Sequence, residues 1–195
     1  QLFIFFAGHG VYNENARMGF LAASDSRKAD PYFRSYLSYA DLGGQYLTNI
    51  KCNRIFVTLD ACFAGSFFDQ STVRGDEPSA ASIEILKRNA TGKKYYKGIS
   101  SGGKEYVADG RPGQHSPFAA SFINTLTNKA YNNSIVTGDV LIASIKSNPP
   151  QATSVCEGKF QYSDPTSHFI FELKASPSAA PTIKTDKMQK SIGGK

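Results

Sequence analysis

The chain has 195 residues, 41% of them hydrophobic, which is enough for one folded domain with a sizeable core. Its net charge of +6 comes mostly from residues 174–195, where five lysines stand against one aspartate. The rest is nearly neutral, which argues against a nucleic-acid-binding surface. Three cysteines without a CxxC pair argue against a disulfide framework and against a structural zinc site.

Residues 2–7 are apolar at every position, which predicts a strand covered on both faces. This strand runs into Gly8-His9-Gly10. Residues 11–37 are polar and aromatic and are interpreted as an excursion with a short strand at 19–23.

Ser38, with Asp41 three residues later, predicts the start of a helix that returns the chain to the next strand. A helical stripe of apolar residues is expected along this helix: Leu42, Tyr46, Leu47 and Ile50. Residues 54–60 then form a second apolar strand, which ends in Asp60-Ala61-Cys62. Together these segments make a βαβ unit, so the fold class is α/β with a mostly parallel sheet.

Small residues and Phe67-Phe68 after Cys62 predict a short helix, whose N-terminal N–H groups and dipole favour a thiolate.

Residues 69–94 are polar and basic, with a helical patch at 80–86. Residues 95–101 are a strand, and the Ser116-Pro117 pair starts a helix. Thr137 or Asp139 opens another helix, which ends at Asn148. Residues 168–173 are the last strand, and Cys156 is expected in a loop before it.

Ser, Ala, Pro and Lys dominate residues 174–195, which predicts a disordered basic tail after a domain of residues 1–173. A reducing compartment suits a reactive thiolate, so a cytoplasmic location is expected.

One apolar strand ends in His9 and another in Cys62. Because the carboxyl ends of parallel neighbours meet at one sheet edge, the two side chains are expected to form a Cys–His nucleophilic pair. The competing interpretation is a buried structural cysteine and a hydrogen-bonded histidine at two unrelated strand ends.

The Gly8-His9-Gly10 motif after a strand, followed by Leu59-Asp60-Ala61-Cys62 with Gly65 beyond, resembles the caspase-like cysteine peptidases. The likeness is strongest to the metacaspase, paracaspase and bacterial caspase-like branch. It continues through residues 98–105 and 116–126 and spans roughly residues 2–173. The resemblance implies a three-layer fold with a mostly parallel sheet flanked by helices, and a cysteine endopeptidase.

The same resemblance implies a strand–helix–strand unit before residue 2, which this chain lacks. The expected partners are therefore an N-terminal fragment or partner chain that supplies the missing strands, and a peptide substrate. No nucleic acid or membrane partner is expected.

Cys62 is predicted to be the nucleophile and His9 the general acid and base. The N–H groups of Gly10 and Cys62 are predicted to form the oxyanion hole.

Asp60 is predicted to bind the substrate side chain in the S1 pocket. Caspases have Gln at this position and cut after Asp, whereas metacaspases and paracaspases have Asp in a pocket that accepts Arg or Lys. A carboxylate in a closed pocket pairs with a cation and repels an anion, so cleavage after Arg or Lys is expected. Glu105 resembles a second acidic pocket residue. The alternatives are a helix cap for Asp60 and a solvated loop acid for Glu105.

No cofactor or metal is expected, because the sequence contains no Walker loop, dinucleotide fingerprint or EF-hand, although some metacaspases need calcium. Ser66 and Ser101 lack the Gly-x-Ser-x-Gly elbow of serine hydrolases. His115 and His168 are interpreted as a loop residue and a strand-end residue.

Two other functions compete with the peptidase. One is a catalytically silent pseudoprotease that acts as an interaction or scaffold module. The other is a different Cys–His hydrolase or a transpeptidase. Residues 69–94 correspond to the caspase intersubunit linker, so self-cleavage there is a further expectation.

Overall fold

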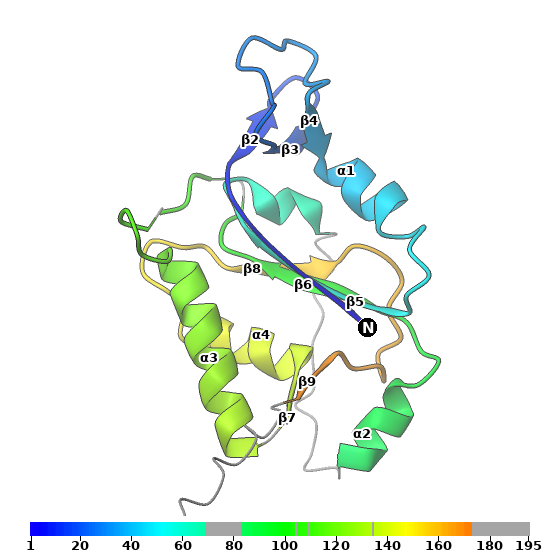
Figure 1. Cartoon of the computed structure of the whole chain (residues 1–195). Coiled ribbons are helices and arrows are strands. Elements are labelled where there is room, and N and C mark those ends of the chain that lie inside the picture. The colour runs from blue at the N-terminus through cyan, green and yellow to red at the C-terminus, as the bar shows by residue number, and fades with distance from the viewer. Residues whose placement is uncertain (69–82, 104, 109, 134, 173–195) are drawn as a thin grey trace, which may run out of the picture.

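A four-stranded sheet forms the centre of the molecule in the computed structural model, which describes residues 1–68, 83–103, 105–108, 110–133 and 135–172. Its spatial order is β1 (Leu2–Ala7), β5 (Arg54–Asp60), β6 (Tyr95–Ser100) and β8 (Cys156–Lys159). The first three strands are parallel, and β8 is antiparallel to β6. Helices lie on both sides of this sheet (Figure 1). The predicted α/β class, with a mostly parallel central sheet flanked by helices, is confirmed.

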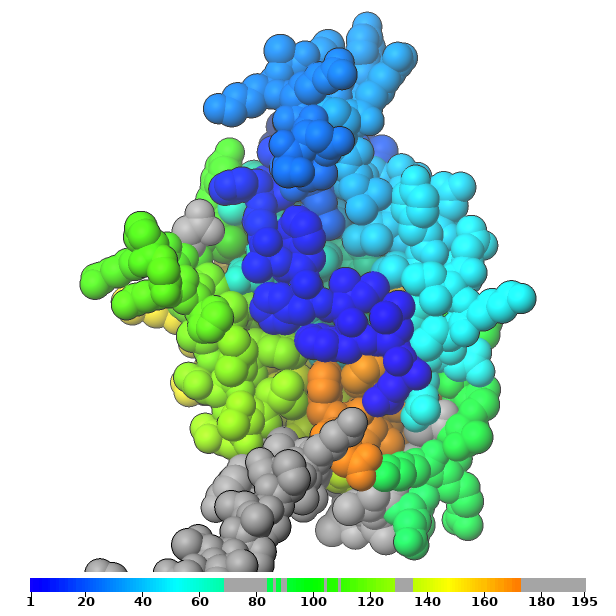
Figure 2. Space-filling model, viewed as in Figure 1, coloured from blue at the N-terminus to red at the C-terminus, as the bar shows by residue number. Residues whose placement is uncertain are grey.

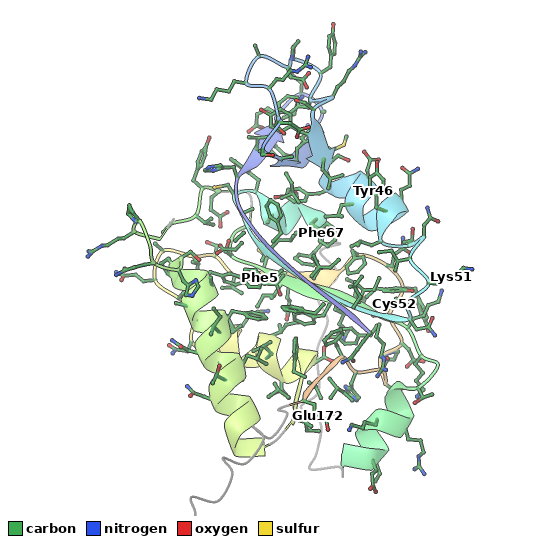
Figure 3. The ribbon with its side chains drawn as sticks, in the orientation of Figure 1. Phe5, Tyr46, Lys51, Cys52, Phe67 and Glu172 are labelled. Atoms are coloured by element: carbon green, nitrogen blue, oxygen red, sulfur yellow. The ribbon has the colours of Figure 1, made fainter. Side chains whose placement is uncertain are left out.

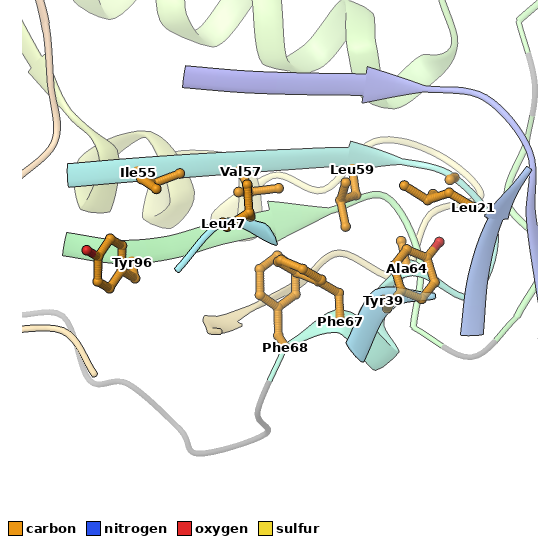
Figure 4. Packing of buried hydrophobic residues seen from close by; sticks show 11 residues of the cluster. Leu21, Tyr39, Leu47, Ile55, Val57, Leu59, Ala64, Phe67, Phe68 and Tyr96 are labelled. Carbon is orange, nitrogen blue, oxygen red and sulfur yellow. The ribbon is translucent and has the colours of Figure 1, made fainter. Parts of the chain in front are cut away.

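Strand β5 is buried on both faces and divides the interior into two cores. Ile55, Val57 and Leu59 point into the first core (Figure 4), where they meet side chains that follow Ser38 and Cys62: Tyr39, Leu47, Ala64, Phe67 and Phe68. Phe56 points into the second core, which contains Tyr95, Ile99, Phe118, Phe122, Leu141, Ile142, Ile145 and Phe169. Each large apolar side chain buried here contributes about 1.5–3 kcal/mol relative to exposure. Both cores therefore hold β5 in place.

Strand β1 is the edge of the central sheet, and its side chains alternate between half-buried and exposed. Phe3 and Phe5 are 39% and 36% exposed. Phe122 covers them only in part, with ring centroids 5.9 Å and 5.4 Å away. The expectation that this strand is covered on both faces is therefore wrong for the described chain, because the face that carries Phe3, Phe5 and Ala7 stays exposed.

The excursion after β1 forms a small antiparallel sheet of β2 (Gly10–Asn13), β3 (Met18–Ala22) and β4 (Tyr36–Ser38). The expected strand at 19–23 corresponds to β3. Because β2 begins at Gly10, directly after His9, this sheet lies at the same end of the central sheet as the carboxyl end of β1 (Figure 1).

Ser38 caps the next helix as predicted: its hydroxyl accepts from Asp41 N at 2.9 Å and donates to Asp41 Oδ2 at 2.7 Å. The α-helical turn α1 (Tyr39–Asp41) passes at once into a π-helix, η1 (Leu42–Tyr46). A π-helix has more residues per turn than the predicted α-helix, so the apolar stripe does not stay on one face. Leu47 is buried, whereas Tyr46 (Figure 3) and Ile50 are 56% and 40% exposed, contrary to the prediction.

The later helices are α2 (Ile83–Ala90), α3 (Pro117–Asn133) and α4 (Gly138–Ser147), and Thr137 caps α4. The last strand, β9 (Ile170–Glu172), is in place but pairs with β7 (Ile135–Thr137) rather than with the central sheet. Cys156 does not lie in a loop, because it begins β8. The short sequence Cys-Glu-Gly-Lys carries no apolar alternation by which that edge strand could be recognised.

Two expected segments fall wholly or partly outside the described residues: the tail at 174–195 and the self-cleavage stretch at 69–94. Within that stretch, residues 83–90 are helical, so Lys87 and Arg88 lie in α2 and not in an extended loop. Among the described residues, no helix combines the length and apolar character needed to cross a bilayer.

A buried ion pair joins β6 to α4 on the second face of the sheet. Lys97 Nζ lies 2.6 Å from Asp139 Oδ1, and the two side chains are 6% and 15% exposed. His168 Nδ1 lies 3.7 Å from Asp139 Oδ2, which is too far for a hydrogen bond and leaves an electrostatic contact. Burial acts to raise the pKa of Asp139, but His168 and the Lys97 ammonium outweigh it and hold that pKa below its ordinary value.

Replacing Asp139 by Asn should lower the free energy of unfolding by roughly 3–5 kcal/mol, because the buried Lys97 ammonium loses its counter-charge. The folded-state pKa of Asp139 lies below the ordinary 3.8, so the carboxylate stabilises the fold above that pH. This contribution should be lost as the pH falls through the lowered folded pKa. Urea denaturation between about pH 7 and about pH 2 measures both effects.

Glu172→Gln is the matched control, since it breaks the exposed Lys87–Glu172 pair, whose side chains are 47% and 54% exposed. Its cost should stay below about 1 kcal/mol. Equal costs for the two variants would contradict the importance given to the buried pair.

Candidate active site

His9 and Cys62 lie at corresponding places beyond two adjacent parallel strands. The register of β1 on β5 ends with Ala7 opposite Asp60, and Gly8 N donates to Asp60 O at 3.0 Å. His9 is two residues past Ala7 and Cys62 two residues past Asp60, so both leave the sheet at the same edge. The His9 side chain is exposed, and Cys62 is half-buried.

Gly10 packs directly against the backbone of Cys62. A Cβ atom built on Gly10 would lie 1.9 Å from Cys62 O and 3.0 Å from Tyr39 Oη. Only glycine permits this approach. The structure therefore brings the segment that carries His9 against the loop that carries Cys62.

The Tyr39 hydroxyl donates a hydrogen bond of 3.1 Å to the same Cys62 carbonyl. Tyr39 is 2% exposed. Burial raises the pKa of Tyr39 well above its ordinary value, and the charge of an ionised Cys62 would raise it further, which keeps the phenol protonated and able to donate. Tyr39 thus fixes the orientation of the Cys62 peptide group.

The Gly10 N–H points away from its neighbour in β3. Gly10 lies opposite Leu21, and Ala22 N donates to His9 O at 2.9 Å. In an antiparallel pair this pattern makes Gly10 and Leu21 the non-hydrogen-bonded pair, so the Gly10 N–H takes no part in the β2–β3 ladder. The oxyanion-hole role of Gly10 needs an N–H that points away from the ladder, and it stays a prediction.

The chain turns sharply just after Cys62. Phe63 has a left-handed backbone (φ 59°), which is uncommon for a bulky residue, and its ring contacts Tyr12 and Tyr106 at 5.7 Å and 5.0 Å. The helix that follows, η2 (Ala64–Phe67), is a four-residue 3-10 turn that begins two residues beyond Cys62. The expected helix N-terminus at Cys62 is therefore absent, because the left-handed residue interrupts the backbone there.

A loop after β6 lies against the Cys62 turn. Phe63 N donates to Glu105 O at 3.2 Å, and Gly65 N donates to Gly103 O at 3.0 Å. Val107 N approaches Cys62 Sγ at 3.5 Å, a weak contact in which sulfur accepts. An N–H aimed at the sulfur favours a partial negative charge on it.

Asp60 opens onto a groove of about 560 Å³ between β1 and α3. The groove walls are largely apolar and include Phe3, Phe5, Ala119, Phe122, Ile123 and Leu126. Asp60 is 7% exposed, and one of its carboxylate oxygens accepts a hydrogen bond from Ser116 Oγ. It does not cap η2, whose capping residue is Phe63 without a side-chain bond, so the cap alternative for Asp60 is not what the structure contains.

Glu105 is not brought together with Asp60 in that groove. Its Oε1 accepts from Gly103 N at 2.9 Å, and it lies on the side of Cys156. The pKa of Cys156 is raised, first by burial and then by the negative charge of Glu105. The groove acid is thus Asp60, while Glu105 shapes its own loop.

The other histidines and cysteines either lie away from this edge of the sheet or make only local contacts. His115 is an exposed loop residue at the groove, His168 precedes β9 beside Asp139, and Cys52 Sγ donates to Arg54 O at 3.2 Å. Across the described ranges, no group of three or more His, Cys, Asp or Glu side chains is arranged to hold a metal ion.

Two residues of this site were missed by the sequence reasoning. Tyr39 follows a recognised helix cap, but no local pattern predicts that its hydroxyl reaches a residue 23 positions later. Ser116 was recognised as a helix start, and its contact with Asp60 spans 56 positions. Such long-range hydrogen bonds depend on tertiary packing rather than on local sequence.

A scan against protein-family models finds no match for this chain, and a search of curated proteins finds none either.

Replacing Gly10 by Ala should displace the Cys62 loop, because the added methyl group would lie 1.9 Å from a backbone oxygen that Tyr39 also holds. We expect a loss of about 1–3 kcal/mol in the free energy of unfolding and a changed rate of Cys62 alkylation by iodoacetamide. Chemical denaturation and mass spectrometry measure the two effects.

Gly44→Ala is the control, since a Cβ atom at Gly44 meets nothing within 4 Å. It should leave the alkylation rate of Cys62 unchanged and the stability equal or slightly higher. If Gly10→Ala behaved like this control, the close approach would be disproved.

Proposed function

We propose that this protein is a caspase-like cysteine endopeptidase that cleaves peptide bonds after Arg or Lys. The observation that carries the proposal is the contact between Gly10 and the Cys62 carbonyl at the shared end of β1 and β5. That contact brings a histidine segment and a cysteine loop together, as a Cys–His hydrolase requires.

In the proposed reaction, the Cys62 thiolate attacks the substrate carbonyl carbon and forms a tetrahedral intermediate. The N–H groups of Gly10 and Cys62 donate to the oxyanion, a contribution of about 3–4 kcal/mol for one such donor. His9 gives its proton to the departing amine, and a thioester to Cys62 remains. A water molecule, deprotonated by His9, then attacks the thioester carbon; the C–S bond breaks, the acid product leaves, and the Cys62 thiolate and the protonated His9 are restored.

The preference for a basic residue follows from Asp60. Among the described residues this 7% exposed carboxylate forms no ion pair, and it faces an apolar groove. A buried, unpaired carboxylate is costly, and a cationic side chain with an aliphatic stem would supply the missing charge and fill the groove. A substrate with Asp at this position would add a second negative charge and be rejected.

A second candidate function is that of an interaction module without catalysis. It is favoured by the exposed Phe3 and Phe5 on β1, an edge strand that crosses the near surface of the molecule in Figure 2. A strand from another polypeptide chain could pair with this edge and cover the two rings. The same pairing is compatible with the peptidase, since it would complete one wall of the groove.

The test is hydrolysis of matched fluorogenic peptides that end in Arg, Lys or Asp by the unmodified protein, with Cys62→Ala as the reference. We expect cleavage after Arg and Lys, no cleavage after Asp, and at least a thousand-fold loss in Cys62→Ala, because no other nucleophile replaces the thiolate. Asp60→Asn should reduce cleavage after Arg while Cys62 still reacts with iodoacetamide.

Cleavage after Asp would retain the nucleophile and overturn the role of Asp60. If no peptide were cleaved, even with calcium added, the interaction module would be the better description. A binding measurement with strand-forming peptides would then compare the unmodified chain with a Phe3→Ser, Phe5→Ser double variant.

A further inference from the structure

The carboxylate of Asp60 is held by a single hydroxyl group. Ser116 Oγ donates to Asp60 Oδ2 and accepts from Ala119 N at 2.9 Å. A serine hydroxyl has one proton. Since the Ala119 N–H already occupies a lone pair of Oγ, that proton points to Asp60.

Ser116 also connects Asp60 to the start of a long helix. Helix α3 spans 17 residues, and its N-terminal N–H groups carry partial positive charge. The bond from Ala119 N polarises the Ser116 hydroxyl and makes it a better donor. The negative charge on Asp60 is thereby stabilised through Ser116 without a cationic side chain that would compete with a ligand.

This arrangement leaves the Asp60 carboxyl group oriented by Ser116 and open to the groove. The carboxylate forms no ion pair within the described residues, and its other oxygen carries no hydrogen bond there. Phe5 and Ala119 line the groove beside it. A carboxylate in these surroundings is suited to bind a cation that comes from outside the chain.

We propose that Ser116 is a positioning residue that holds the Asp60 carboxylate for the cationic side chain of the substrate and thereby sets the selectivity for charge. The inference rests on the proposed peptidase function. Ser116 does not touch the reacting atoms, so its removal should weaken recognition of a basic side chain and leave the reactivity of Cys62 intact.

The experiment compares two fluorogenic peptides that differ only in ending with Arg or with citrulline, which has nearly the same shape without the charge. In Ser116→Ala we expect kcat/KM for the Arg peptide to fall about ten-fold, mainly through KM, with little change for citrulline. Ser116→Thr keeps the hydroxyl and should restore the preference for Arg. The rate of Cys62 alkylation by iodoacetamide should be equal in all three proteins.

Thr137→Ala controls for the loss of a helix cap, because Thr137 caps α4 through Val140 N at 3.3 Å and has no contact with Asp60. It should leave the Arg-to-citrulline ratio unchanged.

If the wild type is active and Ser116→Ala has the same Arg-to-citrulline ratio, the role of Ser116 is overturned but the proposed peptidase function is not. A loss in Ser116→Ala shared equally by both peptides and by alkylation would reveal a structural role and also overturn it. If the wild type cleaved neither peptide, the proposed peptidase function would fail, and the role of Ser116 with it.

Discussion

The parallel pairing of β1 with β5 is the constraint on which the rest of the candidate site depends. It fixes Ala7 opposite Asp60, so the residues that follow, His9 and Cys62, leave the sheet side by side. A slip of one residue would move every side chain of β1 to the other face of the sheet. The apolar Leu2, Ile4 and Phe6 pack against the first core and oppose such a slip. The register of β1 and the geometry of the candidate site therefore have the same origin.

The close packing of Gly10 on Cys62 adds a second constraint on the site. One carbonyl oxygen meets the glycine backbone on one side and the Tyr39 hydroxyl on another. The Cys62 turn is also held by the loop after β6, through Glu105 O and Gly103 O. Three separate segments thus hold one short turn, which explains how a left-handed Phe63 is tolerated there.

The sequence predicts those parts of this fold that depend on local patterns. Strand β5 matches its predicted bounds, and the caps at Ser38 and Ser116 are where their signatures put them. The predictions that are wrong concern features that depend on tertiary context. Gly43 and Gly44 permit a π-turn that exposes Tyr46, and the polar Cys-Glu-Gly-Lys segment becomes a strand only because β6 offers it a partner. In the site, the proximity of His9 and Cys62 follows from topology, whereas the contacts of Tyr39 and Ser116 require the packed structure.

The composition of β1 has a consequence for the behaviour of the chain in concentrated solution. Residues 2–7 contain no charge, no proline and no glycine, and they form an edge strand with one unpaired row of backbone groups in the described structure. Such an edge is a template for cross-β growth between molecules, because its unpaired backbone groups can bond to another strand. Natural edge strands usually carry a lysine, a proline or a bulge that prevents this growth. Self-association along β1 would compete with any strand that covers Phe3 and Phe5. The colloidal stability of the protein is therefore tied to what occupies this edge.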